Sequence, residues 1–306
     1  MSAFAESRSF VPAGQYRSIE ELSRALSMGE LEAGVVIPSD FATKRTRGEV
    51  AEVQFLVDSV NSNTGGIAGG YASRVIAALN EKISLRKSSV QPARASSRVS
   101  IFYNPGLQNS WFIVTGMIGM LMVMLGALAA SAAMVKEKEV GTVEQLLMTP
   151  AGSGEIILAK MAPIFLLLSL DIGLSAVVGD FVFGVPLRGS LLLLYGSGML
   201  CVLSGIGIGT IIATFTRSQQ QAQLMSFFVN PPLSMLSGAT TPVEAMPQWM
   251  QPLTNLNPVK HFAVLARGVM LKGVGLEVLY PNFLALVAFT VILVGVSAWR
   301  FRKQLN

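Results

Sequence analysis

The sequence predicts an α-helical polytopic membrane protein with five visible spans and an N-terminal external α/β domain. The 306-residue chain is 51% hydrophobic and has a mean hydropathy of +0.54. Its apolar residues gather in five long runs, and a helix of about 20 apolar residues crosses the roughly 30 Å hydrocarbon core of a bilayer. Before these runs, short apolar and polar segments alternate. We therefore predict an α/β domain over residues 1–108 and a transmembrane domain over residues 109–306.

Residues 1–108 change pattern repeatedly between short helices and short strands. The expected elements are helices at 19–26 and 71–85 and strands at 33–38, 50–58 and 99–103. Asparagine, serine and glycine at 61–66 indicate a loop. This alternation predicts a small sheet with helices packed on it. The domain lacks a nucleophile motif with a histidine partner, and the phosphate-loop pattern G-x-x-x-x-G-K-[ST] is absent from the whole chain, so no catalytic site is expected.

The apolar runs define the predicted spans, with bounds near 111–134, 158–183, 190–215, 221–239 and 279–299. Basic residues set their orientation, because cytoplasmic loops are enriched in lysine and arginine. When successive spans alternate in direction, seven basic residues fall on the same side: Lys136, Lys138, Lys160, Arg217, Arg300, Arg302 and Lys303. That side is predicted to be cytoplasmic. The turn at 186–188, the segment 240–278 and residues 1–108 then lie outside. The net charge of +5 is explained by this membrane arrangement, so no nucleic-acid partner is expected.

A short charged segment, Val135 to Pro150, separates the first two runs. Thr142 and Gln145 have the spacing of a capping box, and Glu144 lies in the first turn, where a helix dipole favours an anion. Val143, Leu146 and Leu147 share one helical face, and Pro150 ends it. The pattern predicts an amphipathic helix of about two turns at the membrane surface. It is either an ordinary surface helix or a docking element for another protein.

Polar residues inside the runs are candidates for a transport pathway. Asp171 lies midway along the second run, where a carboxylate is costly and therefore functional by default. It either lines a pathway or pairs across a helix interface, or it is a protonated or interior-paired residue that only holds helices together. In the fourth run Asn230 precedes two prolines, which predict a kink. Gly205 and Gly209 form a G-x-x-x-G step that predicts close helix packing.

The charged segment resembles the signature E-x-E-x-G-T-x-E-x-L-x-x-T-P of the membrane subunits of type-2 ATP-binding-cassette (ABC) exporters of the bacterial multidrug type. The matching residues are Glu137, Glu139, Gly141, Thr142, Glu144, Leu146, Leu147, Thr149 and Pro150. The likeness continues in Tyr103-Asn104-Pro105 and in Asn257-Pro258 followed by Arg267. In that family the segment matching 137–149 is the coupling helix, which contacts the ATP-hydrolysing subunit.

The resemblance implies a transport subunit that is not itself an enzyme. ATP and Mg would bind to a separate P-loop ATPase subunit, and this chain would carry no cofactor or metal. A second permease subunit, identical or related, would complete the pathway in the bilayer of the bacterial inner membrane. A periplasmic adaptor is a further candidate partner for the external domain.

The segment 240–278 resembles the short external re-entrant helices of the same family. It is too polar and too rich in proline to cross the membrane, and a tryptophan suits the interface between membrane and water. The resemblance implies that it closes the outer mouth of the pathway. The candidate gate residues are Pro242, Trp249, Asn257 and Pro258. His261 and Cys201 stand alone and are expected to be packing residues rather than metal ligands.

Two other functions are compatible with the pattern. A proton-coupled secondary transporter would use Asp171 as its proton site, and its flux would follow the proton gradient. A non-transporting membrane module would instead transmit ATPase motion to external partners through residues 1–108, without substrate flux. A membrane-embedded enzyme is the weakest alternative, because no paired catalytic groups face one another in any run.

The predicted orientation raises a question about the start of the chain. No apolar segment near Met1 could carry residues 1–108 across the membrane, and members of the family have a span before such a domain. Our hypothesis is that the chain begins late and lacks the first of six spans. An apolar stretch of about 20 residues encoded in frame upstream would support it. The alternative is a five-span protein whose first domain stays inside, against the charge pattern.

Overall fold

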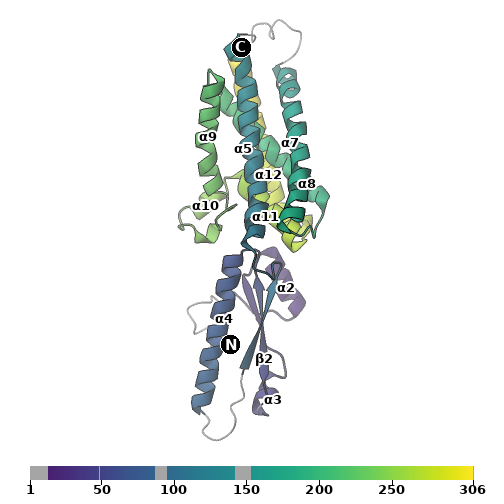
Figure 1. Ribbon diagram of the computed structural model, residues 1–306, viewed down its shortest axis with the longest axis vertical. Helices are drawn as coiled ribbons and strands as arrows, with labels where there is room; N and C mark the ends of the chain where they lie inside the picture. The colour runs from purple at the N-terminus through teal and green to yellow at the C-terminus, as the bar shows by residue number, and fades with distance from the viewer. Residues whose placement is uncertain (1–12, 48, 87–94, 142–152, 306) are drawn as a thin grey trace. The chain divides into compact units, whose positions relative to one another are not determined.

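The computed structural model describes residues 13–47, 49–86, 95–141 and 153–305 (Figure 1). The chain divides into two compact units, Met1–Asn109 and Ser110–Asn306. The first contains both strands and helices, and the second is built from long helices with several short ones.

The α/β unit is built around a three-stranded sheet of order β1-β2-β3. β1 (Ala33–Val36) pairs antiparallel with β2 (Ala51–Asp58), which pairs parallel with β3 (Ala95–Phe102). The helices of this unit are α2 (Ile19–Met28), α3 (Phe41–Thr46) and α4 (Ser62–Arg86). Parallel neighbours need a crossover connection, usually a helix, and α4 lies in the connection between β2 and β3.

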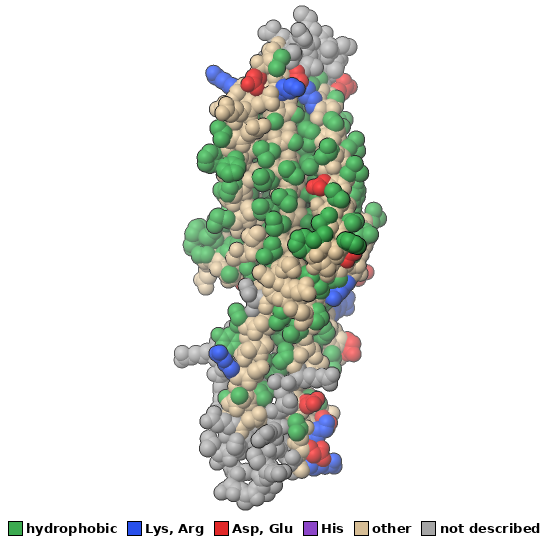
Figure 2. Space-filling view, in the orientation of Figure 1, with side chains coloured by type: hydrophobic (Ala, Val, Ile, Leu, Met, Phe, Trp, Pro, Cys, Tyr) green, Lys and Arg blue, Asp and Glu red, His purple; other side chains and the backbone are tan. Residues whose placement is uncertain are grey.

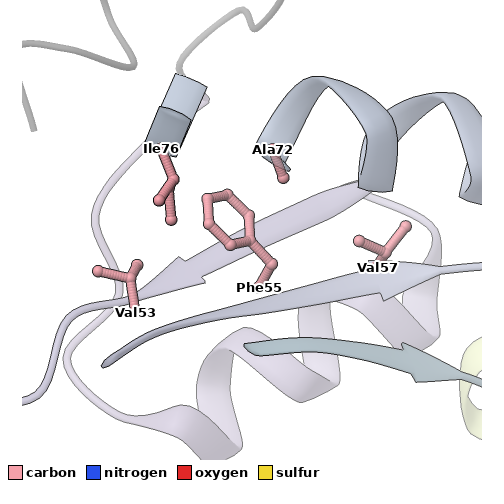
Figure 3. Packing of buried hydrophobic residues seen from close by; sticks show 5 residues of the cluster. All are labelled: Val53, Phe55, Val57, Ala72 and Ile76. Atoms are coloured by element: carbon pink, nitrogen blue, oxygen red, sulfur yellow. The ribbon is translucent and has the colours of Figure 1, made fainter. Parts of the chain in front are cut away.

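The core of the α/β unit lies on both faces of β2, because successive side chains of a strand point to opposite faces. One cluster joins β2 to α4 (Figure 3): Val53, Phe55, Val57, Ala72 and Ile76. On the other face Leu56 packs against Leu22 and Leu26 of α2. Both faces of the central strand are therefore covered by helices.

The predicted loop at 61–66 is wrong, because α4 already begins at Ser62. The turn is made earlier, by Asp58, whose Oδ1 accepts a hydrogen bond from the backbone N–H of Val60 at 3.0 Å. At Gly65 an added Cβ would lie 2.6 Å from the Cβ of Ser59. The glycine therefore lets the helix approach the end of the strand closely. Tertiary packing requires this glycine, and the local composition that predicted a loop could not reveal that.

The helical unit contains four helices that are long and apolar enough to cross a membrane. They are α5 (Asn109–Val140), α7 (Ser153–Phe183), α8 (Leu191–Phe215) and α12 (Leu276–Leu305). By length and composition, the membrane-crossing parts are Asn109–Val140, Glu155–Phe183, Leu191–Phe215 and Leu276–Arg300. These coincide with four of the five predicted runs. Figure 2 shows hydrophobic side chains over the visible face of this unit.

The remaining predicted run, 221–239, forms a shorter helix than expected. α9 (Gln219–Met235) has 17 residues and is about 26 Å long at about 1.5 Å per residue. Its first turn is rich in glutamine, and its two prolines, Pro231 and Pro232, lie close to its end. After Met235 the chain leaves the helix, and Gly238 has a φ of 68°. Each proline removes an i→i−4 hydrogen bond from the helix, and α9 ends three residues after Pro232.

The predicted close packing at Gly205 and Gly209 is confirmed. An added Cβ would lie 2.7 Å from the carbonyl oxygen of Val123 at Gly205 and 2.3 Å from that of Ala127 at Gly209. The backbones of α5 and α8 therefore touch at two positions about one helical turn apart. Lipid tails are as apolar as leucine, so burial of apolar side chains does little to drive helix association in a membrane. Close contacts at small residues contribute to that association instead.

We predict that Gly209→Val destabilises the helical unit, because the added side chain must displace backbone atoms of α5. Overpacking of this kind costs about 1–3 kcal/mol. Thermal unfolding of the purified chain in mild detergent measures the loss. Gly196→Val is the matched control, since Gly196 lies in the same helix and has nothing within 4 Å of an added Cβ. Equal losses for the two variants would contradict the role of the α5–α8 contact.

Candidate functional site

The candidate site begins where α5 passes from apolar to charged sequence. This helix continues to Val140, so its last turns carry the charged residues of the segment singled out in the sequence. Gly141 follows with a φ of 76°, the left-handed conformation that commonly ends a helix at glycine. Glu137, Glu139 and Gly141 are described. The other predicted residues lie outside the described part of the chain: Thr142, Glu144, Leu146, Leu147, Thr149 and Pro150.

Three successive side chains at the end of α5 bind three different helices. Glu137 Oε1 pairs with Lys160 Nζ of α7 at 2.8 Å. Lys138 Nζ donates a hydrogen bond to the carbonyl oxygen of Ala213 in α8 at 2.7 Å. Glu139 Oε2 accepts a hydrogen bond from the backbone N–H of Gln219, the first residue of α9, at 3.1 Å. Successive residues of a helix point about 100° apart, so one turn can reach three neighbours.

In two of these contacts, a charged side chain lies at a helix end whose dipole attracts that charge. Lys138 lies at the C-terminal turn of α8, where carbonyl groups lack partners within the helix. Glu139 lies at the N-terminus of α9, where N–H groups lack partners. The helix dipole makes each such placement worth about 0.3–1 kcal/mol at the surface. The three residues thus hold α5 to the ends of its neighbours.

Further contacts show which chain segments share this end of the helical unit. The guanidinium carbon of Arg300, on α12, lies 4.5 Å from the ring centre of Phe215 at the end of α8. Lys138, Lys160 and Arg300 therefore all lie at one end. This is the grouping of basic residues that the alternation of spans predicted.

At the opposite end, the segment after α9 folds into short helices. These are η1 (Val243–Ala245), α10 (Gln251–Thr254), α11 (Pro258–Arg267) and η2 (Gly268–Lys272). Arg188, in the turn between α7 and α8, donates from Nη1 to the carbonyl oxygen of Leu271 at 2.7 Å. Trp111 near the start of α5 donates from Nε1 to the carbonyl oxygen of Phe183 at 3.2 Å. The turn 186–188 and the segment 240–278 thus share one end.

The four predicted gate residues have different surroundings. Asn257 Oδ1 accepts from the backbone N–H of Val259 at 3.0 Å and thereby caps α11, and its Nδ2 donates to the carbonyl oxygen of Leu233 in α9. Pro258 occupies the first turn of α11, where its missing N–H costs nothing. Pro242 precedes η1. Trp249 is 69% exposed. Of these four residues, Asn257 is the one whose described hydrogen bonds join the segment to α9.

Arg267 connects three segments at this end, and the sequence pointed to it only through its resemblance to the exporter family. Its Nη2 donates to the carbonyl oxygens of Phe112, Gly238 and Ala239 at 3.2, 2.9 and 2.8 Å. Its guanidinium carbon lies 3.5 Å from the ring centre of Phe112. Burial lowers the pKa of Arg267 to about 9, so the side chain remains charged at neutral pH. It fastens α11 to the start of α5 and to the chain that leaves α9.

The two candidate pathway residues are not joined by a hydrogen bond. Asn230 Nδ2 donates to the carbonyl oxygen of Ser226 on its own helix at 2.7 Å. Asp171 is half-buried on α7. Sequence reasoning missed a buried contact between α5 and α9, in which the hydroxyls of Ser131 and Ser226 lie 3.1 Å apart. A serine in an apolar run carries no signal of its partner, because such hydroxyls usually bond to their own helix.

His261 is buried among packed side chains of the helical unit. It is 7% exposed and stacks on Phe289 of α12 with ring centres 5.7 Å apart. Its Nε2 lies 2.9 Å from the carbonyl oxygen of Asn255, and its Nδ1 lies 3.0 Å from Asn282 Oδ1. Among the residues that the structure describes, no group of three histidine, cysteine or acidic side chains could hold a metal ion.

These features define a polytopic helical membrane protein whose long helices are joined by charged and polar contacts at both ends. The sequence matches the family described as "ABC-2 family transporter protein" over residues 1–299. The chain belongs to this family, whose relatives of similar sequence are ABC transporter permeases.

Three relatives from Escherichia coli show the extent of the similarity. "Probable multidrug ABC transporter permease YbhR" is 28% identical over 98% of this chain and 81% of its own length. "Inner membrane transport permease YhhJ" is 31% identical over 94% of this chain and 77% of its own. "Probable multidrug ABC transporter permease YbhS" is 30% identical over 94% and 77%. The similarity therefore covers both units of the chain.

We predict that Glu139→Leu loosens the start of α9, because it removes the anion at that helix N-terminus. A loss of about 0.3–1 kcal/mol raises the population of a locally opened α9 about 2- to 5-fold, and proteolysis of a rapidly opening segment follows that population. Trypsin cleavage after the exposed Arg217 in open membrane sheets measures it. Glu155→Leu, at an exposed site in the first turn of α7, is the control. An unchanged rate in Glu139→Leu would show that the contact does not hold α9.

Proposed function

We propose that this chain is the membrane subunit of an ATP-driven exporter in the bacterial inner membrane. It forms the substrate pathway with a second permease subunit, identical or related, and couples to a separate P-loop ATPase subunit that binds ATP and Mg. Membership of the ABC-2 family supports this proposal. The relatives YbhR and YbhS are named as probable multidrug permeases, which supports drug-like cargo as the substrate class, and the apolar spans suit lipophilic molecules.

The observation that carries the coupling role is the set of contacts made by residues 137–139. They bind α7, α8 and α9, and they are the first residues of the segment 137–149 that resembles a coupling helix. A push on that segment by the ATPase subunit would therefore act on three helices at once, as well as on α5. A loop without such contacts would change its own conformation under the same push and would not move the helices.

α5 gives this push a route to the other end of the helical unit. It is one helix of 32 residues, about 48 Å long at about 1.5 Å per residue, and its start is fastened to α11 by Arg267. We infer that movement of the coupling end shifts the short helices of 240–278 and opens the outer mouth. Pro242, Trp249, Asn257 and Pro258 remain the proposed gate, and Asn230 on α9 remains a proposed pathway residue.

The proposed orientation follows from the basic residues. The end with Lys138, Lys160 and Arg300 faces the cytoplasm, as the positive-inside rule requires. The α/β unit and the segment 240–278 are then external, and α9 is a fifth, short span. An external α/β unit offers a surface for a periplasmic adaptor.

We predict that a P-loop ATPase co-purifies with the tagged chain from its native membrane in mild detergent, and that Glu144→Lys weakens its recovery. Reversing one charge in the contact is expected to cost at least about 1.4 kcal/mol of binding free energy, which is a tenfold loss of affinity. Quantitative mass spectrometry of the eluate measures the ratio of ATPase to permease. Glu277→Lys, which makes the same change in the first turn of α12, is the matched control.

The outcomes of this experiment distinguish the candidate functions. Recovery of an ATPase that Glu144→Lys reduces and Glu277→Lys does not supports the exporter and its coupling segment. Intact chain without an ATPase would overturn the proposal. Recovery of the ATPase without ATP-dependent flux of a lipophilic dye into inverted vesicles would indicate a non-transporting module instead.

A further inference from the structure

The helix α7 has one face packed inside the helical unit and one face open. Leu168, Ile172 and Ala176 form the packed face and are 4%, 2% and 5% exposed. Ile172 contacts α8 so closely that a Cβ added at Gly198 would lie 2.9 Å from its side chain. The open face carries Leu167, Leu170 and Leu174, which are 67%, 74% and 62% exposed. Leucines on an open face fit lipid as well as protein, so they do not by themselves indicate a partner.

Asp171 is the exception on this helix. It lies about 24 Å from Glu155 and about 18 Å from Phe183 along the helix, at about 1.5 Å per residue, and therefore within the hydrocarbon core. Leu167 and Leu174, one turn away on either side, are both exposed. Its carboxylate is half-buried, and no hydrogen bond or ion pair reaches it from the residues that the structure describes. Asp171 thus lies where the packed face meets the open one.

A carboxylate in this position requires a partner. Placing a charged side chain at the centre of a membrane helix costs about 2.5–3.5 kcal/mol, and such residues face other protein groups or water rather than lipid. Ser169 of α7 shows the usual solution for a hydroxyl, since it donates to the carbonyl oxygen of Leu166 on its own helix. An ionised carboxylate has no proton to donate and cannot do the same. In its ionised form it therefore needs a donor from outside the helix.

The chemistry of the partner follows from the charge and from what this chain lacks. The apolar parts of the four spans contain no lysine or arginine, over 110–135, 161–187, 189–216 and 273–299, and neither does α9. A second copy of these helices therefore supplies no cation at this depth, and two Asp171 carboxylates facing each other would repel. We propose that a further membrane-spanning helix, distinct from these and carrying a lysine or arginine, packs on the Leu167–Leu174 face of α7 and pairs with Asp171.

This inference concerns the lateral neighbour of α7 and does not depend on the ATPase. Accessibility of a nitroxide label at position 174 tests it, in the full chain purified with its associated membrane proteins and reconstituted into lipid nanodiscs. Cys201→Ala removes the one native cysteine. Collision with oxygen reports lipid contact, and collision with a water-soluble nickel chelate reports water. A label at Ile292 of α12, which is 58% exposed within another span, provides the lipid-facing reference.

A covering helix is expected to make the label at 174 poorly accessible to both reagents, several-fold below position 292 for oxygen. Oxygen access equal to that at 292 would overturn the proposal in favour of lipid. Access to the nickel chelate would overturn it in favour of a water-filled pathway. Dipolar broadening between two labels at 174 would overturn it in favour of a second copy.

The ion pair is tested by substitution of the carboxylate in the labelled chain. Asp171→Leu is expected to raise oxygen access at 174 to the level at 292, because the cation of the partner helix loses its counter-charge. Asp180→Leu, an exposed aspartate near the end of the same helix, is expected to leave it unchanged. If Asp171→Leu prevents folding, Asp171→Asn removes the charge at nearly constant shape and should raise access to an intermediate level. Unchanged access in a folded Asp171 variant would overturn the pairing.

Discussion

The attachment of three helices to three successive side chains at the end of α5 is the interaction on which the helical unit most depends. In a bilayer, apolar burial does not draw helices together, because lipid offers the same contacts. Hydrogen bonds and ion pairs must then determine which helix ends lie next to one another. Glu137, Lys138 and Glu139 do this for α7, α8 and α9 with an ion pair, a bond to a C-terminal carbonyl and a bond to an N-terminal N–H. Arg267 fulfils the same requirement at the other end of α5.

Between these ends, small residues hold α5 to its neighbours. Gly205 and Gly209 bring α8 against it, and at Gly116 an added Cβ would lie 2.3 Å from the carbonyl oxygen of Ala239. Close backbone contact leaves little room for one helix to bend independently of the other. We therefore expect a displacement at the charged end to be transmitted along α5 rather than absorbed, as the proposed coupling requires. This is the property that a transporter driven from one side requires.

The sequence predicted the elements that depend on local pattern and missed those that depend on distant partners. The apolar runs and their basic ends located four spans, because membrane insertion depends on local composition. The loop at 61–66 was wrong, because Gly65 is required by contact with Ser59 rather than by a turn. The central roles of Arg267 and of the Ser131–Ser226 contact could not be predicted, since each depends on residues far away in the sequence. The segment 142–150 remains a prediction.

The hydroxyl groups within the spans provide the background against which Asp171 is unusual. Thr115, Ser197 and Thr210 bond to carbonyl oxygens of their own helices. Ser204 and Thr290 bond to each other across α8 and α12 at 2.9 Å. A hydroxyl can satisfy itself locally because it donates a proton to a carbonyl three or four residues away. An ionised carboxylate has no such solution, and this is why we propose a neighbouring cationic helix for the half-buried Asp171. The same physical rule that makes the serines and threonines unremarkable therefore makes Asp171 informative.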